Sequence, residues 1–202
     1  MSLLDLLFPP RCGGCGAYGA AWCAACAGTL RPPAVSTLAG IPLLAAGRFD
    51  GRLQQAIHSY KYRPRPQLAS VLAPPLARAI ATAGVSLSAL TFVPLHPRRQ
   101  RERGFNQAQR LAAQLAGALG IPLVSGLTRV RATPAQVGLS QAERRANLAG
   151  AFQWTASQPP GDRLGLVDDV CTTGATLEAC GRALKAAGAG RVEAVTVARV
   201  SV

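Results

Sequence analysis

Residues 164–176 read Leu-Gly-Leu-Val-Asp-Asp-Val-Cys-Thr-Thr-Gly-Ala-Thr, and this stretch decides the fold class of the chain. Residues 164–170 are apolar on both faces until the acidic end, which is typical of a buried central strand in a parallel sheet. Asp168 and Asp169 end this strand, and the following residues lead into a run with helical periodicity. Ligands of open α/β sheets bind beyond the carboxyl ends of such strands. The stretch therefore predicts a ligand site at a strand-to-helix turn.

The polar residues of this turn suit a sugar phosphate. The first N–H groups of a helix are unpaired and bind phosphate, and Thr172, Thr173 and Thr176 add hydroxyl donors. Gly174 lets the backbone approach a ligand closely. Adjacent carboxylates can accept hydrogen bonds from a vicinal diol or lie near a hydrated Mg²⁺. Ribose 5-phosphate carries both features, and the alternative is an ordinary helix start with Thr caps and two solvated acids.

Apolar periodicity on both sides of this stretch alternates between strand and helix character. From residue 89 onward we expect, in order, a strand at 89–95, a helix at 105–119, a strand near 121–125, a strand at 164–170, a helix at 174–187 and a strand at 192–200. Upstream we expect a strand at 43–49 and helices at 53–60 and 68–80. This alternation indicates an α/β fold.

Two C-x2-C pairs lie near the start of the chain, formed by Cys12, Cys15, Cys23 and Cys26. Each such turn aims two thiolates at one point, so two turns complete a tetrahedral zinc site. Disulfide bonds and a redox dithiol are the alternatives, and a reducing cytosol disfavours disulfides. Residues 1–33 carry too little apolar surface to fold alone. We therefore predict a structural Zn²⁺ that stabilises this module.

Composition excludes several classes of protein. Of the 202 residues, 49% are hydrophobic and 15% are charged, which opposes extended disorder. The sequence has no apolar run near the ~20 residues of a membrane-spanning helix, and its start lacks the basic region of a secretory signal. We therefore expect a cytoplasmic protein without a membrane span.

The net charge of +13 is unevenly distributed. Residues 1–90 hold 8 basic and 2 acidic side chains, residues 91–150 hold 9 and 2, and residues 151–202 hold 5 of each. Such an excess attracts nucleic acid or clustered phosphates. Because 20 of the 22 basic residues are Arg in a chain rich in Ala, Gly and Pro, codon bias is an equally open explanation.

Basic and aromatic side chains interleave in residues 60–66, Tyr-Lys-Tyr-Arg-Pro-Arg-Pro. This pattern suits single-stranded nucleic acid, whose bases stack on tyrosines while cations hold phosphates. The alternative is a solvated turn with Tyr rings packed on the core. Further arginines cluster in residues 98–103. The candidate nucleic-acid contacts are Lys61, Arg63, Arg65, Arg98, Arg99, Arg101 and Arg103.

Three segments carry a family resemblance. Residues 164–176 resemble the diphosphate-sugar motif of type I phosphoribosyltransferases, an apolar strand that ends in two acids followed by Thr-Thr-Gly. Residues 93–107, Val-Pro-Leu-His-Pro-Arg-Arg-Gln-Arg-Glu-Arg-Gly-Phe-Asn-Gln, resemble a segment typical of the ComF family, phosphoribosyltransferase-like proteins of bacterial DNA uptake. The pattern R-x-T-x2-Q-x2-L-x4-R-x2-N at 131–147 is similar to the same family, as are the front cysteines and residues 60–62. The resemblance covers nearly the whole chain.

The resemblance implies a type I phosphoribosyltransferase-like open parallel sheet with flanking helices, behind an N-terminal zinc module. We expect three parts: a zinc module at 1–33, a helical bridging or hood segment at 34–88, and a phosphoribosyltransferase-like domain at 89–202. The implied ligand is phosphoribosyl diphosphate with Mg²⁺, with the acids on the ribose hydroxyls, residues 172–176 around the 5-phosphate and the turn at 94–98 near pyrophosphate. The implied contacts are Pro94, Leu95, His96, Arg98, Asp168, Asp169, Thr172, Thr173, Gly174, Ala175 and Thr176.

By the same resemblance, residues 131–147 occupy the place of a mobile catalytic loop. A leaving pyrophosphate needs fixed positive charge, which Arg131, Arg144 and Arg145 can supply from a closing lid. The alternative is a solvated charged loop. The implied catalytic residues are Asp168, Asp169, Arg131 and Arg144.

Three functions are open from the sequence. An enzyme would transfer phosphoribose to an acceptor and release pyrophosphate, either in DNA uptake or in nucleotide metabolism without a DNA role. A component of natural transformation would handle single-stranded DNA beside a helicase-like competence partner. A sensor would bind phosphoribosyl diphosphate without turnover. One fold can carry both a sugar-phosphate site and a basic exterior, so these functions are compatible.

Overall fold

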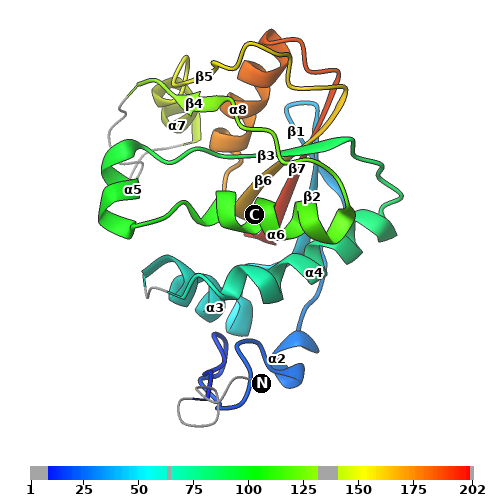
Figure 1. The fold of residues 1–202 in the computed structure, drawn as a ribbon, viewed down its shortest axis with the longest axis vertical. Helices are drawn as coiled ribbons and strands as arrows, with labels where there is room; N and C mark the ends of the chain where they lie inside the picture. The colour runs from blue at the N-terminus through cyan, green and yellow to red at the C-terminus, as the bar shows by residue number, and fades with distance from the viewer. Residues whose placement is uncertain (1–8, 63–64, 132–140, 201–202) are drawn as a thin grey trace.

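The structure is a computed structural model that describes residues 9–62, 65–131 and 141–200 of the 202-residue chain. Its centre is a five-stranded sheet in the order β1-β2-β7-β6-β3 (Figure 1). β2, β7, β6 and β3 are parallel, and β1 pairs antiparallel with β2. The predicted α/β class is therefore confirmed. The strands are β1 (Ser36–Leu38), β2 (Ile41–Arg48), β3 (Ala89–Phe92), β6 (Arg163–Cys171) and β7 (Arg191–Arg199).

Helices cover both faces of this sheet. α4 (Leu68–Thr82) and α6 (Gln107–Leu119) contact one face, and α8 (Ala175–Ala186) contacts the other. In β6, Leu166 packs in the core cluster that contains α8, whereas Val167 packs in the cluster that contains α4 and α6. A strand covered on both faces needs apolar side chains in succession, which explains the apolar run before the acidic end of β6.

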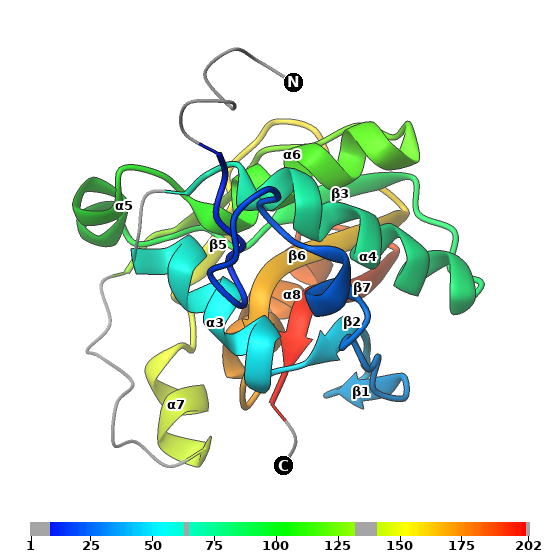
Figure 2. The same cartoon turned by 90° about the horizontal axis from the view of Figure 1, so that it is seen from below.

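The N-terminal module, residues 9–31, packs against α3 (Gly51–Tyr62) and the start of α4 (Figure 2). Its one short helix is α2 (Ala24–Ala27). Gly13 is a point of close approach, because a Cβ there would lie 3.0 Å from the Leu68 side chain. The module therefore supports the face of the α3 and α4 pair that points away from the sheet.

Some elements differ from the sequence-based expectations. The predicted strand near 121–125 is an extended segment with a single bridge, Leu90 to Leu123, because Pro122 has no N–H to donate to a ladder. Residues 97–103 form a helix of their own, and α6 begins at Gln107.

Other elements had no counterpart among those expected from the sequence. They are the short elements α2 and β1, together with α5 (Pro97–Arg103), α7 (Gln141–Asn147) and the antiparallel pair β4 (Leu127–Arg129) and β5 (Phe152–Trp154). The segment expected to bridge the two domains, 34–88, contributes β1 and β2 to the main sheet, and its boundaries stay a prediction. Among the described residues, no helix is both long and apolar enough to cross a membrane.

Candidate functional site

The two acids near the end of β6, Asp168 and Asp169, influence each other electrostatically. Asp169 is 3% exposed, Asp168 is partly exposed, and Asp168 Oδ1 accepts a hydrogen bond from the Asp169 N–H at 2.8 Å. Desolvation raises the pKa of Asp168 well above its ordinary value, the charge of Asp169 raises it further, and Lys61 lowers it. Two carboxylates this close are costly to ionise together without a cation. The pair therefore favours a cation or hydrogen-bond donors beside it.

Lys61, in the last turn of α3, supplies such a cation. Its Nζ lies 2.7 Å from Asp169 Oδ2, and the two side chains are 23% and 4% exposed. The neighbouring Tyr60 is fully buried and donates its hydroxyl to the Gln107 carbonyl at 2.8 Å, which fixes the end of α3 to the start of α6. Removing one partner of a buried ion pair costs about 3–5 kcal/mol. Sequence reasoning placed Lys61 among the nucleic-acid contacts, so this ion pair is a structural finding.

The turn from β6 into α8 has the geometry of an anion-binding turn. Gly174 precedes α8 with a left-handed φ of 82°, and a Cβ there would lie 2.7 Å from a Leu38 side-chain carbon. Both the backbone angle and the available space therefore require glycine. Thr172 is exposed, and Thr173 and Thr176 are partly buried. Gly174 offers no side chain to cap α8, so the N–H groups of the first turn are suited to a ligand.

A second turn, residues 94–98, follows β3 at the same edge of the sheet. His96 Nδ1 accepts a hydrogen bond from the Arg98 N–H at 3.3 Å and caps α5. Asn106 ties the turn to α6, because its amide donates to the Val93 carbonyl at 3.0 Å while its Oδ1 caps the helix. The predicted pyrophosphate turn thus lies beside β6, and Asn106 is a positioning residue whose capping role was not predicted.

A basic pocket of about 640 Å³ lies between the end of α3 and α5, and we call it the α3–α5 pocket. The Arg103 guanidinium lies 5.6 Å from the centroid of the Tyr62 ring, and Tyr62 is 72% exposed. An exposed ring among cations is the arrangement that stacks bases and holds phosphates. The pocket is lined by Lys61, Tyr62, Arg99, Arg101, Glu102, Arg103, Gly104 and Phe105.

The other predicted nucleic-acid contacts lie elsewhere. Arg98 forms an exposed ion pair with Glu102 at 2.8 Å, and Arg65 donates to the Arg11 carbonyl of the N-terminal module at 3.1 Å. Arg63 lies outside the described residues. The structure therefore gathers four of the seven predicted cations, namely Lys61, Arg99, Arg101 and Arg103.

The arginines of the expected catalytic loop are bonded around α7. Arg131 Nη2 donates to the carbonyls of Asn147 and Ala149 at 2.8 and 2.7 Å. Arg145 makes two hydrogen bonds of 2.9 Å to Glu178 in the first turn of α8, and Glu178 is 2% exposed. This bidentate pair connects α7 directly to α8, the helix that follows the turn at 172–174. The side chain of Arg144 and residues 132–140 lie outside the described part of the chain.

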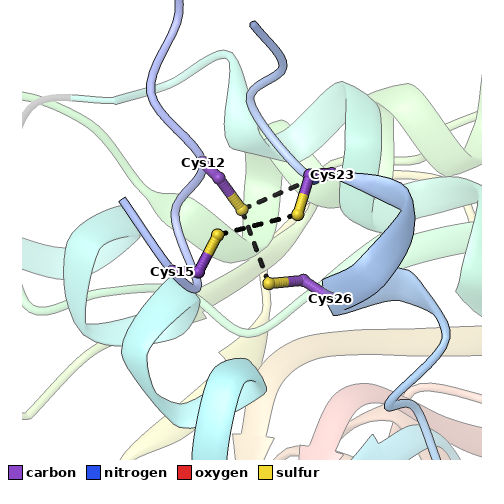
Figure 3. A group of neighbouring side chains, drawn as sticks. All are labelled: Cys12, Cys15, Cys23 and Cys26. Atoms are coloured by element: carbon purple, nitrogen blue, oxygen red, sulfur yellow. Dashed lines mark hydrogen bonds between the residues drawn. The ribbon is translucent and has the colours of Figure 1, made fainter. Parts of the chain in front are cut away.

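The four front cysteines converge on one point (Figure 3). Their sulfurs lie within 4.8 Å of one another, with Cys12 to Cys26 and Cys15 to Cys23 at 3.6 Å. This separation is far beyond an S–S bond of about 2.05 Å and close to the edge of about 3.8 Å in a tetrahedron with Zn–S of about 2.3 Å. Burial raises the pKa of Cys12, but hydrogen bonds from backbone N–H groups outweigh it and bring the value to about 6, whereas burial and the neighbouring thiols raise the pKa of Cys26. The donor set fits Zn²⁺, which thiolates bind.

Family models match both parts of the chain. A phosphoribosyl transferase domain model matches residues 101–201, and a double zinc ribbon domain model matches residues 3–38. The DNA utilization protein YhgH of Salmonella typhimurium is 33% identical over 190 residues, which cover 91% of this chain and 80% of that protein. Competence protein F of Haemophilus influenzae is 41% identical over 114 residues. The chain belongs to the ComF family.

The match between this ComF-family chain and the Haemophilus competence protein F is partial in length. The matched segment covers 55% of this chain and half of the Haemophilus protein. A solved structure, a glutamine phosphoribosylpyrophosphate amidotransferase from B. subtilis complexed with ADP and GMP, superposes with a TM-score of 0.48 at 24% identity. That superposition covers 68% of this chain and 30% of the amidotransferase chain. The ComF-family zinc segment, 3–38, contains four cysteines and no histidine, which is enough for one tetrahedral site.

Proposed function

We propose that this ComF-family protein binds phosphoribosyl diphosphate with Mg²⁺ at the carboxyl end of β6, as part of bacterial DNA utilization. The observation that carries the proposal is the acid pair near the end of β6, followed by the Thr-Thr-Gly turn that starts α8, since a diol and a phosphate are the two groups that this arrangement accepts. The phosphoribosyl transferase domain model over residues 101–201 supports the same ligand class.

Each part of the ligand has a matching part of the site. The ribose hydroxyls would donate to Asp168 and Asp169, the 5-phosphate would accept from residues 172–176, and the diphosphate would lie near the turn at 94–98. A hydrated Mg²⁺ fits beside Asp168, because this carboxylate is partly exposed and oxygen ligands are those that Mg²⁺ prefers. When bound, Mg²⁺ neutralises charge on the diphosphate.

Thermal unfolding with and without phosphoribosyl diphosphate and Mg²⁺ tests this proposal. A ligand that binds only the folded chain raises Tm by mass action. The double variant Asp168→Asn/Asp169→Asn should lose this increase at neutral pH, because amides carry no charge for the cation and accept hydrogen bonds less strongly. An unchanged increase in the double variant would move the site elsewhere. Release of pyrophosphate across a panel of nucleobases then separates a transferase from a sensor.

We propose single-stranded DNA as a second ligand of the same protein, in natural transformation beside a helicase-like competence partner. The α3–α5 pocket favours this, because Arg99, Arg101 and Arg103 line it together with the exposed Tyr62. The relatives named for competence and for DNA utilization support a DNA role. The DNA would contact the α5 side of the pocket, next to the sugar site.

A further inference from the structure

Lys61 belongs to two neighbouring sites at once. Its Nζ is 2.7 Å from Asp169 Oδ2 at the end of β6, and its side chain also lines the α3–α5 pocket. From α5, Arg99, Arg101 and Arg103 line the same pocket. One ammonium group therefore separates a buried carboxylate from a basic cavity.

This arrangement makes the ion pair sensitive to an anion in the pocket. The Lys61 ammonium is a single positive charge on a flexible four-carbon stem, so an anion in the pocket and the Asp169 carboxylate attract the same group. Its side chain is 23% exposed, and Lys61 is one of the residues that line the pocket. A ligand shifts such an equilibrium by the difference in its affinity for the two arrangements. An anion that binds Lys61 therefore competes with Asp169.

We propose that a diphosphate group entering the α3–α5 pocket draws the Lys61 ammonium away from Asp169 and so frees this carboxylate for the sugar. The inference rests on the proposed sugar-diphosphate site and names the residue that links its two ends. The coupling is reciprocal, because sugar binding at Asp169 strengthens anion binding in the pocket by the same factor.

The pocket favours a small condensed phosphate over a nucleic-acid strand as the partner of Lys61. Its volume of about 640 Å³ is typical of small-molecule sites, which span roughly 300–1,000 Å³. Lys61 also reaches a carboxylate that is only 4% exposed, so the contact lies deeper than a strand crossing the surface of α5 would need.

Calorimetric titration of the zinc-loaded full chain with inorganic pyrophosphate, without added Mg²⁺, tests the proposal. Lys61→Met alone leaves Asp169 without a cation and could unfold the chain, so we compare Asp169→Asn with the double variant Lys61→Met/Asp169→Asn. Asp169→Asn should bind pyrophosphate at least as tightly as the wild type, because Lys61 is already released. The double variant should bind about tenfold more weakly than Asp169→Asn. Equal affinity of these two variants overturns the proposal.

Lysine-specific ¹³C labelling reads the exchange of partners directly, because Lys61 and Lys185 are the two lysines of the sequence. Lys185 lies in α8 and donates to the Gly190 carbonyl, so Lys185→Met is the matched control and should leave pyrophosphate affinity unchanged. Pyrophosphate should move the Lys61 ε-methylene signals toward their positions in Asp169→Asn, with Lys185 unmoved. Signals that respond to an oligo(dT) strand and not to pyrophosphate overturn the proposal in favour of nucleic acid.

These outcomes are separable from those of the sugar site. If pyrophosphate binds through Lys61 but phosphoribosyl diphosphate with Mg²⁺ does not stabilise the chain, the role of Lys61 is supported and the proposed sugar site is contradicted. If phosphoribosyl diphosphate stabilises the chain but Asp169→Asn and Lys61→Met/Asp169→Asn bind pyrophosphate equally, the sugar site is supported and the role of Lys61 is contradicted.

Discussion

Replacing Gly174 with alanine should weaken both the fold and the proposed phosphate turn. Gly174 has a φ of 82° at the start of α8, and a Cβ added to it would meet the Leu38 side chain of β1. The same substitution at Gly188 is a matched control, because Gly188 has a φ of 90° but no heavy atom within 4 Å of the position that its Cβ would take. The two variants therefore separate backbone strain from steric crowding.

Two costs add at Gly174, and one applies at Gly188. A left-handed backbone costs a residue with a Cβ about 1–2 kcal/mol, partly offset by about 0.4–1 kcal/mol from the less flexible unfolded chain. At Gly174 the methyl would also lie 2.7, 3.0 and 3.3 Å from three carbons of Leu38, and such overpacking costs about 1–3 kcal/mol. We expect losses of about 2–3 kcal/mol for Gly174→Ala and about 0.5–1 kcal/mol for Gly188→Ala. Tm should fall by roughly 4–12 °C and 1–4 °C.

Thermal and urea unfolding followed by circular dichroism measure both losses. Adding Leu38→Ala to Gly174→Ala removes the crowding, so the double variant should be more stable than the sum of the single effects, by about 1 kcal/mol. Stabilisation by phosphoribosyl diphosphate should be weakened in Gly174→Ala and kept in Gly188→Ala. Equal losses of stability in the two glycine variants would refute the packing argument.

Three further predictions follow from the zinc cluster, the basic pocket and the acid pair. Metal analysis should find one Zn²⁺ per chain. Chelation should loosen residues 1–33 while the sheet keeps its circular-dichroism signal. Four titratable front thiols without bound metal would contradict this prediction. Oligo(dT) binding should weaken with salt, with a slope of about 0.7 per phosphate neutralised in a plot of log binding constant against log salt concentration. Arg101→Ala/Arg103→Ala should lower that slope. No binding at low salt would falsify the DNA proposal. Asp168→Asn should stabilise the ligand-free chain at pH 7 and not below about pH 3, as urea unfolding at both pH values can show. The reason is that the fold raises the pKa of the Asp168 carboxyl. The folded chain therefore loses stability as pH rises from the ordinary pKa of this carboxyl to its pKa in the fold.

Local chemistry explains which features the sequence predicts. The acids of β6 and the four cysteines each belong to a short local motif, so the sequence alone predicts that they group together. α5 is different, because residues 97–103 contain no large apolar side chain and therefore no hydrophobic period. Only the capping His96 and Pro97 at the first turn mark this helix. β4 and β5 are three residues each, too short for an alternating pattern.

The ion pair between Lys61 and Asp169 could not be predicted from local patterns. It depends on the strand order, since β2 lies beside β7 and β7 beside β6, which brings the helix after β2 to the end of β6. The hydroxyl of Tyr60 then fixes that helix against α6. From the sequence, Lys61 between two tyrosines is predicted to be a surface contact. Its partner Asp169 lies more than 100 residues along the chain, so no local pattern predicts the ion pair.

The charges around the end of β6 follow an order that matches a sugar diphosphate. The turn at 172–176 offers helix N–H groups, the next position along the site holds two carboxylates, and beyond Lys61 lies a pocket lined by arginines. A phosphate, a diol and a diphosphate present the complementary groups in the same order. The acids come from the charge-balanced last part of the chain, and the cations from the basic part before residue 104. A positive surface alone would attract any polyanion. In the proposed site the acid pair lies between two groups of anion-binding donors, so it would select a ligand whose centre donates hydrogen bonds. A phosphoribosyl diphosphate meets this requirement through its ribose hydroxyls.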